Sequence, residues 1–268
     1  MSSANSRTML SKVPEVTAFF WIIKVLGTTV GETAADYLNI SLKLGLQGAT
    51  LVMGSLLAVS LFLQIRSRRY VPWIYWLTVI LISIVGTLIT DNLSDGLHVP
   101  LQVSTIAFSV LLSVAFYVWY ANEKTLSIHS IYTTKRELFY WTAILFTFAL
   151  GTAGGDLMGE RLHLGYLASL LIFAGAIAAV SVGYRFFRLS SNLSFWVAYI
   201  LTRPLGASLG DLLTQPHSTM GLGLGSPGGL AFGRGPVNLV FFVAIVGLVV
   251  FLTLVKIDRP REVPLEAE

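Results

Sequence analysis

The sequence contains no cysteine and few charged residues. Among 268 residues there are 18 lysines and arginines and 14 aspartates and glutamates, so that 12% of the chain is charged. The absence of cysteine excludes disulfides, thiolate metal ligands and cysteine nucleophiles. A soluble domain is typically about 25% charged, whereas this chain is 54% apolar, with a mean hydropathy of +0.74. The composition therefore indicates a membrane protein.

Long apolar runs take the place of charge. A run of about 20 apolar residues crosses a bilayer as a helix. The sequence predicts eight such spans, at about 15–38, 44–64, 71–91, 99–120, 138–157, 162–184, 194–213 and 235–256. The first span carries Lys24, Glu32 and Asp36 and shows no small-residue cleavage site, so we do not interpret it as a signal peptide. We expect an all-α membrane protein with eight transmembrane helices, forming a single domain over residues 1–268.

The basic residues are distributed unequally between the connections. Thirteen precede the first span or follow even-numbered spans: Arg7, Lys12, Arg66, Arg68, Arg69, Lys124, Lys135, Arg136, Arg185, Arg188, Lys256, Arg259 and Arg261. The other connections hold only Lys43, Arg161 and Arg234. Because cytoplasmic connections carry the excess of Lys and Arg, both termini are predicted to be cytoplasmic. The net charge of +4 therefore reflects topology, and the expected partners are the lipid bilayer and a small cation, not nucleic acid.

One pattern occurs four times along the chain. The segments "GETAADYL", "GTLITDNL", "GTAGGDLM" and "GASLGDLL" each place an aspartate five residues after a glycine, and a tryptophan precedes each aspartate by fifteen residues. The repeated residues are Asp36, Asp91, Asp156 and Asp211; Gly31, Gly86, Gly151 and Gly206; and Trp21, Trp76, Trp141 and Trp196. The spacing predicts four repeats, at about 14–69, 70–122, 134–189 and 190–258, each a helical hairpin. Because all four point the same way, we expect parallel repeats in a pseudo-fourfold or nested twofold arrangement.

The spacing also assigns positions across the membrane. The tryptophans begin the odd-numbered spans, where they are expected to act as anchors at the cytoplasmic interface. Fifteen residues of helix carry each aspartate about 22 Å further, into the outer part of the bilayer. Each repeated glycine is followed four residues later by another small residue, a pattern that suits close helix packing. The odd-numbered helices should therefore form an inner ring, with the even-numbered helices largely outside.

The segment "KVPEVTAFFWIIKVLGTTVGETAADYL" and its three weaker echoes resemble a known family. This family consists of bacterial integral membrane proteins described as four copies of a short repeat of unknown function. The resemblance covers most of residues 12–256. It implies a multi-pass protein of the bacterial inner membrane. It implies no chemistry, so the function is argued from the residues.

Charged residues inside the spans are the candidate site. Such residues usually face a bundle interior and mark an ion or proton path. The residues four positions before the aspartates are Glu32, Thr87, Thr152 and Ala207. The residues eight positions before them are Thr28, Ser83, Phe148 and Arg203. We expect the four aspartates and Glu32 to bind a cation or couple protons, supported by Lys24, Thr28, Thr87, Thr152 and Arg203. Lys24 and Glu32 form either a structural pair or a proton relay or gate, in which Lys24 acts as a tethered cation that competes with the transported one. Arg203 is expected to neutralise Asp211.

Carboxylates and hydroxyls are hard ligands that suit magnesium, calcium or manganese. His98 and His163 follow their aspartates by seven residues and His217 follows Asp211 by six; as metal ligands they favour manganese. Proton coupling or plain exposure on a loop are the alternatives for them. No cofactor is expected beyond a bound divalent cation. Gly223, Gly225 and Gly228 match GxGxxG formally, but no strand precedes them, so a dinucleotide site is not predicted.

The sequence favours a transporter that exchanges a divalent, manganese-like cation against protons through a central ring of aspartates. The alternative is an integral membrane enzyme that acts on a lipid or isoprenoid substrate with Asp/His acid–base or metal-bound chemistry. Each aspartate stands alone on its own helix, and no Ser–His–Asp spacing occurs, which disfavours the enzyme. A sensor or scaffold would need an output domain that this sequence does not contain. A homo-oligomer is compatible with transport and with catalysis.

Overall fold

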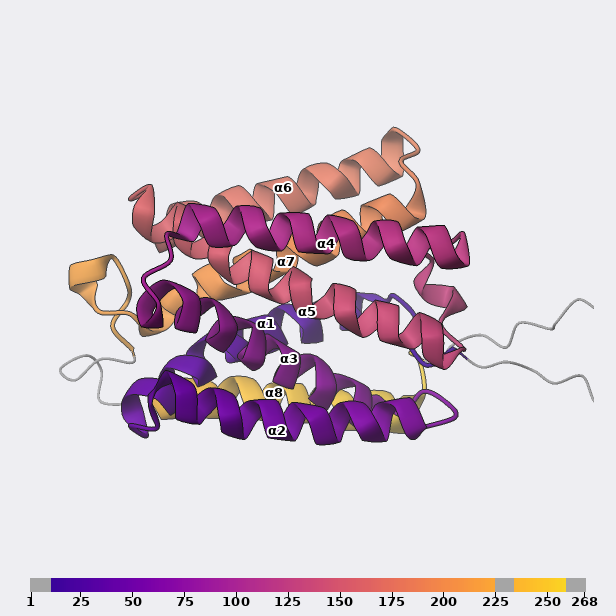
Figure 1. Cartoon of the computed structure of the whole chain (residues 1–268), viewed down its shortest axis with the longest axis horizontal. Helices are drawn as coiled ribbons and strands as arrows, with labels where there is room; N and C mark the ends of the chain where they lie inside the picture. The colour runs from indigo at the N-terminus through magenta and orange to yellow at the C-terminus, as the bar shows by residue number, and fades with distance from the viewer. Residues whose placement is uncertain (1–10, 225–233, 259–268) are drawn as a thin grey trace, which may run out of the picture.

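The computed structural model describes residues 11–224 and 234–258, which form helices and no strand. Eight long helices follow one another in the chain: α1 (Ala18–Asp36), α2 (Gly45–Arg66), α3 (Pro72–Asp91), α4 (Leu101–Glu123), α5 (Thr134–Asp156), α6 (Tyr166–Phe186), α7 (Ser191–Thr214) and α8 (Arg234–Val255). Their bounds agree with the predicted spans to within a few residues. All eight lie roughly along one axis (Figure 1).

The odd-numbered helices begin at well-defined signals in the sequence. Thr17, Thr133 and Ser190 precede α1, α5 and α7, and each side chain accepts a hydrogen bond from a backbone N–H of the first turn. Such caps satisfy amide groups that a helix start leaves without a partner. Helix α3 begins instead with Pro72, whose missing N–H costs nothing at this position. The starts of these four helices are therefore encoded locally.

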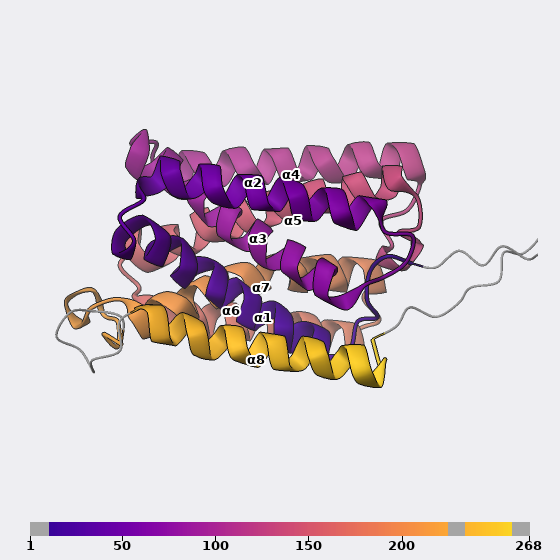
Figure 2. The ribbon, with the colours of Figure 1, turned by 90° about the horizontal axis from the view of Figure 1, so that it is seen from below.

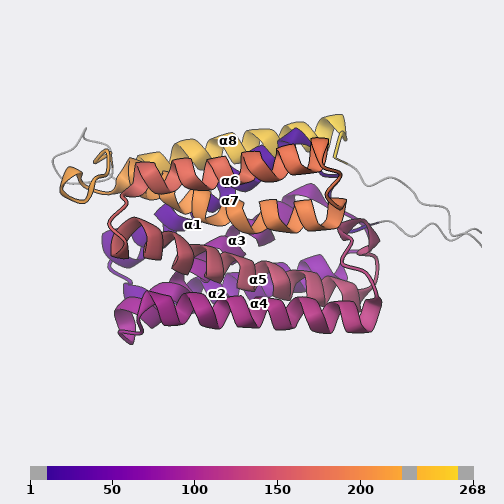
Figure 3. The same cartoon turned by 90° about the horizontal axis from the view of Figure 1, so that it is seen from above.

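Helices α1, α3, α5 and α7 form the inner ring, as predicted. Helix α1 packs against α3 and α7, and α5 packs against the same two helices, so that the four close a ring. Helices α2 and α8 lie along one edge of the bundle and α4 and α6 along the opposite edge in Figure 1, α2 and α4 form the upper edge in Figure 2, and α6 and α8 form the upper edge in Figure 3. Large apolar side chains such as Leu51, Ile106 and Leu171 remain exposed on these outer helices, as expected for surfaces that face lipid.

The hairpins do not pack as the repeat pattern suggests. Each even-numbered helix packs mainly against the odd helix of the next repeat: α2 on α3, α4 on α5, α6 on α7, and α8 back on α1. Hydrogen bonds support this packing between repeats. The Ser60 hydroxyl on α2 is 2.6 Å from the Thr78 hydroxyl on α3, and the Asn238 amide on α8 donates to the Thr33 carbonyl of α1. Each repeat therefore covers its neighbour, and the last repeat closes on the first.

The prediction of eight membrane spans is confirmed only in part. Among the described residues, six helices are long and apolar enough to cross a membrane: Gly45–Arg66, Pro72–Gly96, Leu101–Glu123, Thr134–Gly159, Tyr166–Phe186 and Pro236–Val255. Helices α1 and α7 fall outside this group. They carry Lys24, Glu32, Asp36, Arg203 and Asp211, and these charges are accommodated because both helices lie inside the bundle. The six apolar helices are typical of a multi-pass membrane protein.

The repeated glycines form the contacts between neighbouring repeats. A Cβ added at Gly31 would lie 2.5 Å from Ser83 Cβ, at Gly86 2.8 Å from Phe148 Cβ, at Gly151 2.6 Å from Arg203 Cβ, and at Gly206 2.6 Å from Thr28 Cβ. Each glycine thus meets the residue that lies eight positions before the aspartate of the next repeat. The same contact occurs four times around the ring, so the inner helices have pseudo-fourfold packing that requires glycine at these positions.

The repeated tryptophans pack inside the bundle, and their place at the membrane interface stays a prediction. Trp76, Trp141 and Trp196 are at most 5% exposed, and Trp21 is half-buried. In every repeat an aromatic residue stands directly before the tryptophan, and it packs against the tryptophan of the next repeat. The four pairs are Phe20 with Trp76, Tyr75 with Trp141, Tyr140 with Trp196 and Phe195 with Trp21. These eight side chains, the aromatic layer, fill the ring at the end where the odd helices begin.

Candidate functional site

The repeated aspartates end the inner helices in a special way. In the first three repeats, Asp36, Asp91 and Asp156 are the last α-helical residues, and a five-residue π-helical turn follows each of them. A π turn is a rare element that is frequently found at functional sites. In the fourth repeat, α7 continues beyond Asp211 to Thr214 without such a turn. The wider turn redirects the chain toward the next outer helix.

All four aspartates line one cavity, as does Glu32. The cavity has a volume of about 440 Å³, and its wall also includes Asp95, His98, Arg161 and Gln215. Asp95, His98 and Arg161 are exposed, so the cavity opens at the end of the bundle opposite the aromatic layer. The Gln215 amide donates to Asp36 at 3.1 Å. We call this space the acidic cavity.

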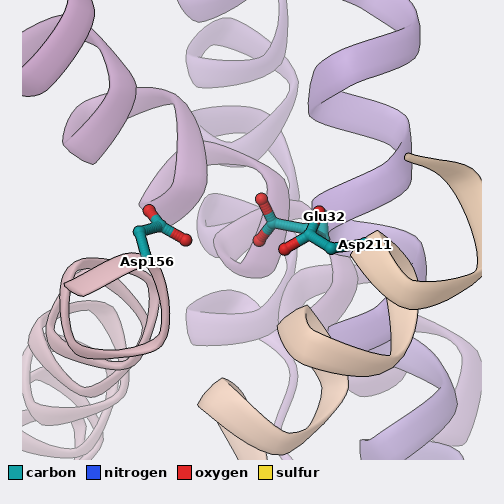
Figure 4. Close-up of side chains that lie close together, drawn as sticks. All are labelled: Glu32, Asp156 and Asp211. Carbon is teal, nitrogen blue, oxygen red and sulfur yellow. The ribbon is translucent and has the colours of Figure 1, made fainter. Parts of the chain in front are cut away.

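Three carboxylates converge at the inner part of the acidic cavity. Glu32, Asp156 and Asp211 each offer an oxygen, and these oxygens all lie within 4.8 Å of one another. The three side chains come from α1, α5 and α7 and point toward a common space (Figure 4). Oxygens around a calcium ion stand about 2.3–2.6 Å from the ion, so one hard cation could bridge all three oxygens at this spacing.

Arg203 forms the floor of the acidic cavity. Its side chain is fully buried, and Nη2 donates to Glu32 Oε2 at 2.8 Å and to Thr152 Oγ1 at 2.7 Å, and also to Thr87 Oγ1. These three acceptors all lie four residues before a repeated aspartate. A guanidinium bound to a carboxylate and hydroxyls is well suited to burial. The carboxylate that binds Arg203 is thus Glu32, whereas the sequence had suggested Asp211.

Lys24 lies below this floor without the predicted carboxylate partner. It is fully buried, and its Nζ has no hydrogen-bond acceptor. The Nζ atom is 3.5 Å from the centre of the Tyr199 ring and 4.8 Å from that of Phe148. Among the described residues, the contacts that would stabilise a charge on Lys24 are these two cation–π contacts. A structural Lys24–Glu32 pair is therefore not what the structure contains.

The supporting hydroxyls fall into two groups. Thr87 and Thr152 accept from Arg203, and each also donates to the carbonyl four residues before it on its own helix. Thr28 instead lies at the contact with Gly206, and its carbonyl accepts from Arg203 Nη1 at 3.3 Å. Two of the three predicted threonines thus present hydroxyls to the site.

The three candidate histidines stay outside the carboxylate cluster. All three are exposed, and only His98 lines the acidic cavity. His98 and His163, like Lys43 in the first repeat, have φ near +55° and reverse the chain after the π turn. Non-glycine residues adopt this left-handed conformation at a cost, so the alignment of these positions reflects a shared turn. His217 contacts Gly223, while Gly225 and Gly228 lie outside the described residues.

Some residues near the axis were not singled out from the sequence. The hydroxyls of Tyr75 and Tyr140 are 2.5 Å apart inside the bundle, and Tyr199 lies beside Lys24. Tyr75 and Tyr140 immediately precede two of the repeated tryptophans, so the repeat register could have identified them. Lys12 and Glu137 form a buried ion pair of 2.7 Å between the N-terminal segment and α5. No repeat signal marks that pair.

The fold and the acidic cavity define a helical, multi-pass type of membrane protein in which four repeats surround one polar site. A family model described as Repeat of Unknown Function (DUF347) matches residues 19–70, 74–125, 139–189 and 194–258. The chain belongs to this family, which confirms the resemblance inferred from its four repeats. Comparisons with curated proteins and with solved structures gave no match.

Proposed function

We propose that this protein is a membrane transporter that exchanges a hard divalent cation against protons. The observation that carries the proposal is the convergence of five carboxylates from four inner helices on one cavity that is open at a single end. Acidic residues on inner helices are costly in a membrane and usually mark ion paths. Three oxygens within 4.8 Å of one another suit a single cation with oxygen ligands.

The surroundings of the carboxylates refine the choice of ion. Manganese was favoured over magnesium and calcium on the strength of the histidines, and these side chains lie outside the cluster. The cluster itself offers only carboxylate oxygens, which suit all three ions. The proposed cargo is therefore a hard divalent cation as a class, and manganese is one member to test.

Alternating access follows from the blocked axis. Below the acidic cavity, Arg203, Phe148, Lys24 and Tyr199 occupy the centre of the bundle, and the aromatic layer lies beyond them. A cation that enters the cavity cannot continue along this path without rearrangement of the helices. With the basic connections in the cytoplasm, both termini would be cytoplasmic and the acidic cavity would face outward in a bacterial inner membrane.

The groove on the side of the bundle disfavours the enzyme alternative. An enzyme for lipid or isoprenoid substrates needs an apolar passage that reaches its acid and base. A largely apolar groove of about 540 Å³ lies between α1, α6 and α7, near the end where the odd helices begin. Its lining includes Glu15 and His129, whose Oε2 and Nδ1 are 4.0 Å apart, but none of the carboxylates of the acidic cavity, on which the enzyme alternative would depend. Transport into the open acidic cavity therefore fits the geometry better.

Cation flux tests the proposal. The purified protein is placed in liposomes that contain a metal-sensitive dye and a pH probe, and manganese, magnesium, calcium and sodium are added one at a time. Asp156→Asn and Asp211→Asn, which alter the cluster, should abolish flux of the transported ion. Glu123→Gln, which alters a carboxylate outside the acidic cavity, serves as the control and should retain flux. Absence of flux for every cation, or flux that survives both cluster variants, would refute transport through this site.

A further inference from the structure

We propose that Lys24 carries the exchanged proton and that proton binding at Lys24 and cation binding at Glu32 exclude one another through Arg203. This inference rests on the proposed function and adds its coupling residue. Lys24 is fully buried and its Nζ has no hydrogen-bond acceptor. A buried ammonium group without a counter-ion is costly, and lysine, unlike arginine, can lose its proton at such a site. Lys24 can therefore alternate between neutral and charged forms.

Arg203 connects the two binding events. It holds Glu32 at 2.8 Å, and its guanidinium carbon is 5.8 Å from the centre of the Phe148 ring, which Lys24 also contacts at 4.8 Å. Because both side chains lie against the Phe148 ring, Arg203 and a protonated Lys24 are close enough to repel one another. A proton on Lys24 therefore repels the guanidinium and holds it against Glu32, where it competes with a cation from the acidic cavity. When Lys24 is neutral, Arg203 is free to withdraw toward Phe148 and release Glu32 for the cation.

A row of tyrosine hydroxyls offers the proton a path from the other end of the bundle. The Tyr199 ring lies next to Lys24 Nζ, but neither Lys24 Nζ nor the Tyr199 hydroxyl has a hydrogen-bond partner among the described residues, so a proton passes between Tyr140, Tyr199 and Lys24 only after side-chain rotation. The Tyr140 hydroxyl is 2.5 Å from that of Tyr75. Each hydroxyl takes up a proton on its oxygen and releases the one that it held, and the hydroxyls then rotate back before the next passage.

The row continues to Tyr70 and Asp258, which are both buried. The Tyr75 ring contacts the ring of Tyr70 with centroids 5.7 Å apart, and the Tyr70 hydroxyl donates to Asp258 Oδ2 at 2.5 Å. These tyrosines lie within or beside the aromatic layer, whose packed side chains exclude a hydrated metal ion. Protons would thus approach Lys24 from the end of the bundle opposite the acidic cavity.

The test measures manganese uptake and proton movement together in proteoliposomes. In Lys24→Met, the number of protons moved per manganese ion should fall by more than about tenfold, because couplings between two sites are typically worth about 5–150-fold. Lys24→Arg keeps a permanent charge, so it should weaken manganese binding by a factor in the same range at every pH. Tyr120→Phe, on an exposed tyrosine of α4, is the control and should match the parent.

The double variant Tyr75→Phe/Tyr140→Phe provides a second test that does not depend on Lys24→Met folding. It removes two hydroxyls and keeps both rings, and it should slow proton movement relative to manganese movement. Unchanged proton movement per manganese ion in Lys24→Met or in the double variant would overturn the inference, because the carboxylates would then carry the proton. If the parent protein moves no cation at all, the proposed function itself fails, and the two failures remain distinguishable.

Discussion

Two glycines on α5 test whether the repeats are held together by close helix contact. A Cβ at Gly151 would lie 2.6 Å from Arg203 Cβ and 3.0 Å from Pro204 Cδ, whereas a Cβ at Gly154 would meet nothing within 4 Å. Carbon atoms in contact stand about 3.5–4.0 Å apart, so Gly151→Ala must separate α5 and α7 by roughly 1 Å. Overpacking of this kind costs about 1–3 kcal/mol. We therefore expect Gly151→Ala to be less stable than Gly154→Ala.

The comparison of the two variants isolates the packing effect. Both exchanges gain the same helix propensity of about 0.8–1.0 kcal/mol over glycine, so this contribution cancels between them. The remaining difference of about 1–3 kcal/mol corresponds to a difference of about 2–12 °C in the midpoint of thermal unfolding, at about 2–4 °C per kcal/mol for a chain of this size. The assay is thermal unfolding of both purified variants in the same detergent. Equal midpoints would refute the inferred close contact between the repeats.

Two further changes test other parts of the structure. Lys12→Met should destabilise the fold by about 3–5 kcal/mol, because it leaves the buried Glu137 carboxylate without its cation. The control is Lys135→Met, which removes an exposed ion pair and should cost less than about 1 kcal/mol in the same unfolding assay. His98→Gly should be neutral or should stabilise the fold by up to about 1 kcal/mol, since φ near +56° favours glycine, and it should leave manganese affinity unchanged; a tenfold loss of affinity would instead identify His98 as a ligand.

The sequence predicted the inner ring because the signals for it are local and repeated. Tryptophan, glycine and aspartate recur at fixed distances, and the helical period places Gly151 and Asp156 near one another on a single helix. Because the repeated aspartates and glycines lie on the odd-numbered helices, the sequence also predicted that α2, α4, α6 and α8 lie outside. The sequence could not indicate that α2 packs on α3, because an outer helix with apolar residues on every side does not show which helix it contacts. The π turns after Asp36, Asp91 and Asp156 had no sequence signal either.

The partners of the axial charges were harder to predict. Lys24, Glu32 and Asp36 share one helix face, which suggested a pair between Lys24 and Glu32. The actual partner of Glu32 comes from α7, and this pairing depends on the order of helices around the ring. Arg203 lies one turn below the layer of Glu32, Thr87 and Thr152, yet its long side chain reaches up into that layer. The spacing of residues along the sequence predicts the height of each backbone position, but it does not predict where the end of a long side chain lies.

The pseudo-fourfold scaffold and the unequal residues on its axis have complementary roles. Four equal positions on an axis would bring four like charges together at each layer, which is tolerable only where water enters, as at the four aspartates of the acidic cavity. In the layer below, the only repeated position with a charge is Glu32, and the other three are two threonines and Ala207. The deeper charged residues are Arg203 and Lys24. Ala207 is the smallest residue of its layer and lies on the same helix as Arg203, so it leaves room for the guanidinium. That group binds residues from all three other repeats. One repeat thus supplies the cation that the others surround, and this asymmetry is what an exchange mechanism needs and a fourfold pore does not.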